Sequence, residues 1–259
     1  MAAATPIDGS ARRATTGGEA ARAFVSLLDV DPDLAEGIPA ADHPLARRAL
    51  ARPVHELDAD ADSLIQGEGA FGLLIVEGVV VRELELAGRA CTEILGPGDV
   101  IGATPADALL PIPVTWKALA PASVIVLDAR FTTAAQRWRS LSVNLQRRLL
   151  EQVHRSAVHA AIAQLPRVER RVLALLWQLA ERWGRVTPFG VEVGLTLTHE
   201  AVGRLVGAQR PTVSLALAEL ARDGTLTRTV RRTWLLSNDS RDLVRPAGAP
   251  APGATTPTA

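Results

Sequence analysis

The spacing of apolar residues changes along the chain and predicts three structural regions. Between about Ser63 and Leu127, β-branched runs such as LLIVEGVVV and SVIVL alternate with Gly and Pro turns such as GPGD and LPIP. Short strands separated by such turns indicate an antiparallel sheet folded as a sandwich or barrel. From about Thr133 to Ala163 there is no Gly or Pro and apolar residues recur every four positions, which predicts one long helix.

The apolar residues of this predicted helix form a stripe along one face. At about 1.5 Å per residue the helix would extend roughly 45 Å, longer than a small domain needs. The stripe can pack on the helix's own sheet or against the same helix of a second subunit. We expect the dimer, because a helix that joins two domains leaves much of its apolar face uncovered. The predicted dimer interface consists of Leu141, Leu145, Leu149, Val153, Ala157 and Ala161.

The third region has the turn signals of a helix-turn-helix. An amphipathic helix ends at Gly184, and a hairpin follows around residues 188–190. Thr198 then precedes HEAVGRLV as an N-cap, Gly207 ends this short helix, and a second helix follows with Pro211 in its first turn. Two short helices joined by a tight glycine turn make a helix-turn-helix.

A wing is predicted after the second helix. Gly224 ends that helix, and two β-rich runs around Arg231 and Arg232 follow. In a winged helix the second helix enters the major groove of DNA and the wing reaches phosphates. The periodicity predicts that the buried side chains are those of Val202, Leu205, Val206, Val213, Ala216, Leu217 and Leu220. It predicts that the outward side chains are those of Arg210, Pro211, Thr212, Ser214, Leu215 and Ala218.

Composition and charge narrow the interpretation. A chain of 259 residues is long enough for two domains. The sequence has no run of roughly 20 apolar residues, and its first residues lack the apolar core of a secretory signal. Its one cysteine excludes an intramolecular disulfide. Together these features favour a cytoplasmic protein. The net charge is zero, but residues 165–245 hold 13 Lys and Arg against 8 Asp and Glu, which favours a polyanion partner for that part.

These patterns predict a division of the chain. Residues 21–132 would form a roll with flanking helices, residues 133–163 the long helix, and residues 164–240 the winged helix. Residues 1–20 and 241–259 are rich in Ala, Gly, Thr or Pro without periodicity, and we expect both segments to be disordered.

The segment LTHEAVGRLVGAQRPTVSLALAEL resembles the helix-turn-helix of the Crp/Fnr transcription regulators, and VEGVVV and GPGDVIG resemble parts of their β-roll. The resemblance covers roughly residues 40–237. It implies an α+β fold with an N-terminal cyclic-nucleotide-binding-like β-roll, a long dimerisation helix and a C-terminal winged helix. It also implies a homodimer that binds a palindromic operator in double-stranded DNA.

The resemblance assigns DNA contacts to particular residues. Arg210 would read a guanine edge, where an arginine pairs bidentately with two acceptors, and Arg231 matches the basic group of the wing. The positions that contact or neighbour phosphates in the family match Thr198, His199, Gln209 and Thr212. The whole predicted DNA-binding set is Thr198, His199, Gln209, Arg210, Pro211, Thr212, Ser214, Leu215, Arg231 and Arg232.

This chain departs from the best-known members at two base-reading positions. Pro211 and Leu215 replace a Glu and an Arg, so the operator of those members is not expected here. A leucine can contact a thymine methyl, and DNA shape can contribute the remaining discrimination.

The roll lacks the residues that bind cyclic nucleotides in the family. A buried cyclic phosphate needs backbone N–H donors and an arginine, which those members supply through a Gly-Glu-Leu step and a later Arg-Ser pair. Here residues 102–104 read Gly-Ala-Thr and residues 113–114 read Pro-Val, and neither Lys117 nor Arg130 has the expected spacing. We expect no tight binding of cyclic AMP or cyclic GMP through this cassette, but another ligand or none. The candidate effector pocket consists of Gly98, Gly102, Ala103, Thr104, Val114 and Trp116.

The sequence gives little indication of catalysis, metal binding or redox chemistry. The absence of a P-loop, a nucleophile elbow and a paired metal-ligand run predicts no enzyme, no metal and no cofactor. His154 and His159 lie five residues apart, which does not place them side by side, and we expect both on the solvated helix surface. Cys91 is either a redox thiol or, as we expect for a strand cysteine, a small core residue.

The sequence therefore predicts a homodimeric, sequence-specific DNA-binding transcription regulator. RNA polymerase is a candidate partner, and no membrane partner is expected. Two alternatives stay open: a regulator that binds DNA constitutively without an effector, and a dimeric adaptor that uses its winged helix for protein contacts.

Overall fold

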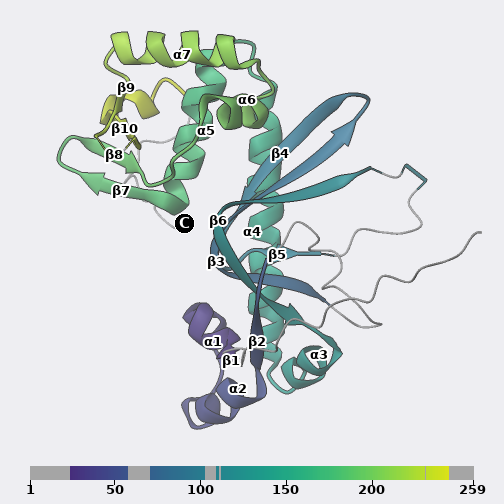
Figure 1. Ribbon diagram of the computed structural model, residues 1–259. Helices are drawn as coiled ribbons and strands as arrows, with labels where there is room; N and C mark the ends of the chain where they lie inside the picture. The colour runs from purple at the N-terminus through teal and green to yellow at the C-terminus, as the bar shows by residue number, and fades with distance from the viewer. Residues whose placement is uncertain (1–23, 58–70, 103–108, 111, 231, 245–259) are drawn as a thin grey trace, which may run out of the picture.

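The protein consists of two lobes joined by one long helix, α4 (Arg139–Ala163) (Figure 1). The computed structural model describes residues 24–57, 71–102, 109–110, 112–230 and 232–244. The N-terminal segment expected to be disordered lies outside these residues, as does most of the C-terminal one. Within the described ranges, no helix has the length and apolar character needed to cross a membrane.

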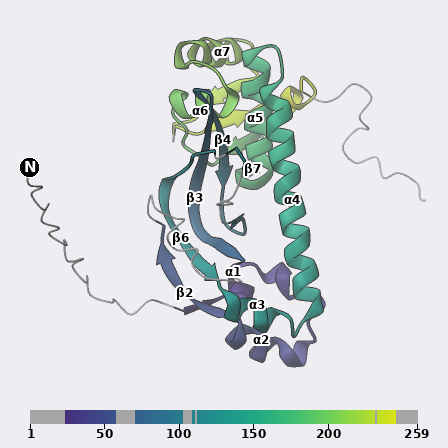
Figure 2. The same cartoon turned by 90° about the vertical axis from the view of Figure 1, so that its right-hand side faces the viewer.

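The lower lobe contains a curved antiparallel sheet. Its strands are β1 (Phe24–Ser26), β2 (Ala51–Glu56), β3 (Gly72–Leu86), β4 (Arg89–Leu95), β5 (Val100–Ile101) and β6 (Val114–Leu127). The strand order is β1-β2-β6-β3-β4, and β5 pairs with β3. The register of β3 against β6 shifts around Gly78 (φ +89°), where a Cβ would lie 2.4 Å from the Pro121 carbonyl oxygen. Such irregularities bend strands, and the sheet curls alongside α4 (Figure 2).

Short helices flank the sheet and complete two apolar cores. They are α1 (Leu27–Val30), α2 (His43–Ala49) and α3 (Ala129–Ala135), with 3-10 turns at Pro32–Ala35 and Ala40–Asp42. Leu74 and Phe131 belong to the core between the sheet, these helices and α4, whereas Ile75 and Trp116 belong to a second core within the roll.

The long helix begins later than the sequence predicts. The expected helix over residues 133–163 is split, because α3 ends at Ala135 and α4 starts only at Arg139. Trp138 interrupts the helical path with an extended backbone (φ −120°, ψ 98°). Its ring is buried and its Nε1 donates to Asp42 Oδ2 at 3.2 Å. A tertiary contact therefore overrides the local helical pattern.

The structure also corrects the predicted dimer stripe. Leu141 and Leu145 are buried in the core of their own lobe, and Leu149 packs against the same core. These side chains cover the sheet of their own subunit, so the prediction that Leu141 and Leu145 face a partner was wrong. The apolar or small side chains that are exposed along α4 are Val143, Leu150, Val153, Ala157, Ala160 and Ala161.

The upper lobe has the predicted order of a winged helix. Its elements are α5 (Val168–Trp183), β7 (Gly184–Thr187), β8 (Gly190–Val193), α6 (His199–Val206), α7 (Arg210–Arg222), β9 (Leu226–Arg228), β10 (Trp234–Leu236) and a 3-10 turn (Asn238–Arg241). The strands form one sheet in the order β7-β8-β10-β9. All seven side chains of α6 and α7 predicted to be buried lie in its core, so this part of the prediction is confirmed.

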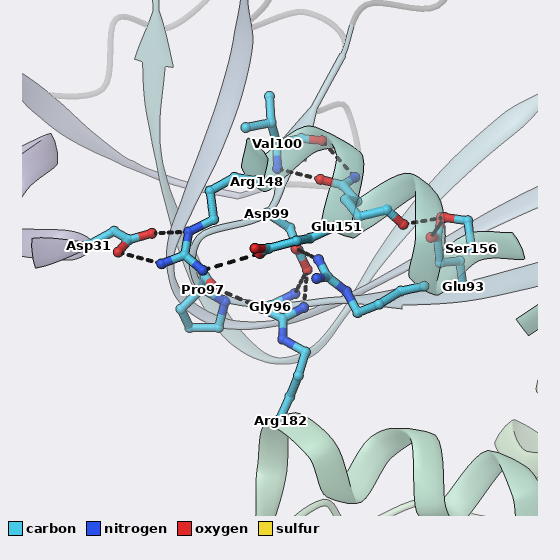
Figure 3. A network of polar contacts seen from close by, with 12 residues as sticks. Asp31, Glu93, Gly96, Pro97, Asp99, Val100, Arg148, Glu151, Ser156 and Arg182 are labelled. Atoms are coloured by element: carbon cyan, nitrogen blue, oxygen red, sulfur yellow. Dashed lines mark hydrogen bonds and ion pairs between the residues drawn. The ribbon is translucent and has the colours of Figure 1, made fainter. Parts of the chain in front are cut away.

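A turn of the roll, Gly96–Asp99, holds the two lobes together (Figure 3). Asp99 is 2 % exposed, and its carboxylate accepts from Gly96 N at 2.9 Å and pairs with Arg155 of α4 and Arg182 of α5. A Cβ on Gly96 would lie only 2.6 Å from the Trp183 ring, so this turn sits tightly against the end of α5.

Two single-residue predictions in this region were wrong. Cys91 is exposed on β4 and is not a core residue. His154 is exposed as expected, but His159 is buried between α4 and α5, with Nδ1 3.3 Å from Gln178 Oε1. Helical spacing places His159 on a face of α4, but only the packing of α5 buries that face.

Candidate nucleic-acid interface

Two short helices and a glycine turn position the candidate DNA-reading surface. Thr198 caps α6, since its Oγ1 accepts from Ala201 N at 3.1 Å. Gly207 ends α6 in the left-handed conformation (φ 63°), which glycine adopts without a Cβ penalty. Pro211 lies in the first turn of α7, where its missing N–H costs no hydrogen bond. As a result, α7 lies on the outer side of the upper lobe, away from the roll (Figure 1).

The outward face of α7 carries half of the residues predicted to contact DNA, namely Arg210, Pro211, Thr212, Ser214 and Leu215. Gln209 precedes the helix and makes no side-chain capping hydrogen bond. Leu215 is 72 % exposed, a large value for a leucine. Ser214 is half-buried, and its Oγ donates to the Arg210 carbonyl oxygen at 3.0 Å. The remaining predicted residues on this face, all exposed, are Arg210, Pro211 and Thr212.

The wing is the β9–β10 hairpin. Arg232 is exposed at its tip and has a left-handed backbone (φ 63°). Val230 beside it is fully exposed. Arg231, also predicted to contact DNA, lies outside the described residues.

An open basin lies between α6, the start of α7 and the wing. It is lined by Thr198, His199, Glu200, Arg210 and Arg228. Arg228 was missed by the sequence reasoning, although its place in the wing strand that follows the recognition helix was a usable signal. Its guanidinium lies over the Trp234 ring, 5.2 Å from the centroid. Neither Arg210 nor Arg228 pairs with a carboxylate in the described part of the chain.

The surroundings of the basin disfavour the protonated form of the His199 imidazole. Burial lowers the pKa of the His199 imidazole, and the positive charges of Arg228 and Arg210 lower it further. Its Nδ1 lies 2.9 Å from Ser214 Oγ, and its ring lies near that of Trp234, 6.4 Å between centroids.

The structure describes four of the six residues predicted for the effector pocket. Gly98 turns the chain with φ +85°, Gly102 is exposed and Val114 is half-buried. Trp116 is buried within the roll, and its Nε1 has no hydrogen-bond partner among the described residues. Ala103 and Thr104 lie outside the described residues.

The two cations considered as substitutes for the missing arginine are placed elsewhere. Lys117 follows Trp116 on β6 and so faces the other side of the strand, where its Nζ pairs with Glu83 at 2.9 Å. Glu83 also pairs with Arg204 of α6 at 2.7 Å, so Lys117 belongs to the contact between the lobes. Arg130 is exposed on α3. Across the described residues, no group of three or more His, Cys, Asp or Glu side chains is arranged to hold a metal ion.

Comparison with known proteins identifies the family. The sequence profile of the Crp-like helix-turn-helix domain matches residues 170–243. Over 213 residues the chain is 30% identical to the CRP-like cAMP-activated global transcriptional regulator of Mycobacterium tuberculosis, covering 79% of this chain and 93% of that protein. The chain belongs to the Crp/Fnr family of transcription regulators.

The chain is also similar to two further proteins. The HTH-type transcriptional regulator Cmr of Mycobacterium tuberculosis is 29% identical over 196 residues, covering 70% of this chain and 77% of that protein. A CooA mutant from Carboxydothermus hydrogenoformans has the same fold, with a TM-score of 0.58 and 20% identity over 74% of this chain and 84% of that chain.

Family membership confirms the broad functional prediction. This Crp/Fnr protein is a DNA-binding transcription regulator, and its family does not consist of enzymes. The α+β fold with a roll and a C-terminal helix-turn-helix is confirmed as well. Apart from Leu141 and Leu145, which are buried in the core of their own lobe, the residues assigned to DNA, to a dimer or to an effector stay predictions.

Proposed function

We propose that this regulator binds an imperfect palindrome in double-stranded DNA as a homodimer. The observation that carries the proposal is the outward face of α7, which presents Arg210 with no carboxylate partner in the described part of the chain, beside small polar side chains and Leu215. A twofold axis through paired subunits would place two α7 helices about one DNA turn, roughly 34 Å, apart.

The exposed part of α4 supports the dimer. Leu150 and Val153 are 69 % and 64 % exposed, and the spacing places both on one face with Val143 and Ala157. Large apolar side chains in a row on a solvated helix lose contact with water when a second copy covers them. We propose that this face, together with Ala161, is the dimer interface.

Base reading and phosphate binding fall to different residues in this proposal. Arg210 pairs with a guanine, and Leu215 contacts a thymine methyl. The phosphate-binding residues are Thr198, His199, Gln209, Thr212, Arg231 and Arg232. Because phosphate contacts release counterions, the affinity falls steeply as the salt concentration rises.

We further propose that cyclic AMP does not control this regulator through the usual cassette. Pro113 and Val114 stand where the resemblance places the family's Arg-Ser pair. Lys117 is paired with Glu83 between the lobes. Either another ligand binds in the roll and controls DNA binding, or the protein binds DNA constitutively.

Contact with RNA polymerase is proposed for a separate surface. Val186 and Phe189 are 82 % and 81 % exposed at the β7–β8 hairpin, at positions that the DNA-binding set does not use. Exposed apolar pairs of this kind suit a protein partner.

The proposal is tested by selecting binding sites from random duplex DNA with the full-length protein, with and without cyclic AMP. We expect one palindromic motif under both conditions. Enrichment only with cyclic AMP would overturn the part that concerns the cassette. Failure to enrich any motif, together with salt-insensitive binding to a protein, would favour the adaptor.

A further inference from the structure

The basin beside α7 concentrates positive charge around one histidine. Arg210 and Arg228 both line it and both raise the electrostatic cost of protonating His199. Glu200 also lines it, but its Oε1 accepts from Arg204 Nη2 at 2.7 Å, and Arg204 pairs with Glu83 as well. The acidic group at the basin is therefore ion-paired, whereas neither arginine has a carboxylate partner among the described residues.

The two contacts of Ser214 are compatible with one tautomer of His199. The Ser214 hydroxyl has one hydrogen, and it donates to the Arg210 carbonyl oxygen at 3.0 Å. The contact of 2.9 Å between Ser214 Oγ and His199 Nδ1 is then satisfied when Nδ1–H donates to the hydroxyl oxygen. When both contacts of Ser214 form together, neutral His199 carries its proton on Nδ1, and Nε2 is the nitrogen that accepts a further proton.

We propose that His199 and Arg228 form a DNA-phosphate site beside α7, and that His199 takes up a proton when the phosphate binds. The inference rests on the proposed DNA-binding surface and adds Arg228 to it. Protonated His199 donates from Nδ1 to Ser214 and from Nε2 to a phosphate oxygen. The Trp234 ring holds the Arg228 guanidinium at the same basin without neutralising it.

The direction of the pH effect follows from the charges around His199. The groups that face it are Arg210 from α7, Arg228 from β9 and the neutralised Glu200 from α6, while Trp234 of β10 contributes no charge. In the free protein these arginines and burial keep the pKa of His199 below its ordinary value. A bound phosphate opposes both arginines and raises that pKa. The complex therefore binds more protons than the free protein, and affinity for DNA rises as the pH falls between the two pKa values.

The test is isothermal titration of the full-length protein with a random-sequence duplex of about three helical turns at low salt. Titrations in two buffers with different ionisation enthalpies give the number of protons taken up per subunit. Above the lowered pKa of free His199 and below the raised pKa of the complex, we expect a positive uptake. The affinity should rise on acidification by up to about tenfold per pH unit for each proton taken up. H199Q keeps a hydrogen-bonding side chain but cannot titrate, so we expect it to lose this uptake.

The matched control is H154Q, which removes an exposed histidine of α4 that the DNA-binding set does not include. We expect it to keep the uptake of the natural protein. Equal uptake in the natural protein and H199Q would overturn the inference while leaving DNA binding intact. Failure of every form to bind duplex DNA would instead overturn the DNA-binding surface on which the inference rests.

A second variant separates a direct role from a structural one. R228Q removes one of the two charges that lower the pKa of His199, so an NMR titration of the free variant should show that pKa raised. The number of phosphate charges neutralised should fall by about one per subunit, which reduces the slope of log affinity against log salt correspondingly. An unchanged imidazole titration and an unchanged salt slope would exclude Arg228 from the site.

Discussion

Among single residues, Arg210 is the best-placed candidate to read a base of the operator. It is exposed at the start of α7 and forms no ion pair within the described ranges, so its guanidinium is available to a base edge. We expect R210A to lose about 1–3 kcal/mol of binding free energy at the cognate base and to accept other bases there. Competition binding against operators changed at one position measures this loss. R222A, at the other end of α7, is the control and should keep the preference.

Two leucines of α7 are expected to have different roles, one in the stability of the fold and the other in DNA recognition. Leu217 is 4 % exposed in the lobe core, whereas Leu215 is 72 % exposed. We expect L217A to lower the free energy of unfolding by about 2–5 kcal/mol, because it leaves a cavity. L215A should change that free energy by less than about 0.5 kcal/mol but weaken binding to the selected operator. Urea unfolding and operator titration of both variants test the pair; equal loss of stability would show that Leu215 packs in the fold.

At the level of elements, the turn between α6 and α7 depends on two glycines for different reasons. Gly207 has φ 63°, and a Cβ there would meet no atom within 4 Å. Gly203 lies inside α6, where a Cβ would come within 2.6 Å of the Ala208 carbonyl oxygen. The first position is limited by backbone conformation and the second by close packing of the turn.

This difference predicts different responses to substitution. G207A should cost about 1–2 kcal/mol of stability, since an L-residue must adopt the left-handed region. G207N should cost less, because asparagine tolerates that region. G203A should displace the turn and weaken operator binding as well as stability. Thermal unfolding and operator affinity of the three variants distinguish these cases; a smaller effect of G207A than of G207N would contradict the conformational argument.

On the scale of the whole molecule, the subunit's own packing limits which face can meet a partner. The lower part of α4 covers the sheet through Leu141 and Leu145, and the turn at Asp99 holds α5 against the roll. These contacts leave the face with Leu150 and Val153 as the exposed apolar surface of α4.

The proposed dimer can be tested on that face. L150E should raise the dimer dissociation constant by more than about tenfold, because burying an unpaired carboxylate costs more than about 1.4 kcal/mol. L86E, at another leucine that is half-exposed but lies on β3, is the control. Sedimentation velocity over a range of concentrations measures both variants. An unchanged dimer in L150E would place the interface elsewhere.

Local signals predicted the winged helix well, since its elements begin and end through interactions within a few residues. A capping hydroxyl at Thr198, a left-handed position at Gly207 and a proline in the first turn of α7 act on their own neighbours. The burial of α6 and α7 then followed from the helical period alone. The same holds for the hairpin around residues 188–190, which the structure contains as β7 and β8.

Distant contacts determine the features that the sequence pattern did not reveal. Trp138 breaks the long helix because Asp42 accepts from its indole, 96 residues away in the chain. His159 is buried because α5 packs over it, and Leu141 and Leu145 are covered by their own sheet. Arg210, Arg228 and His199 meet in one basin only when α6, α7 and the wing are packed together. Periodicity reports which face of an element is apolar, but what covers that face depends on the packing of the whole chain.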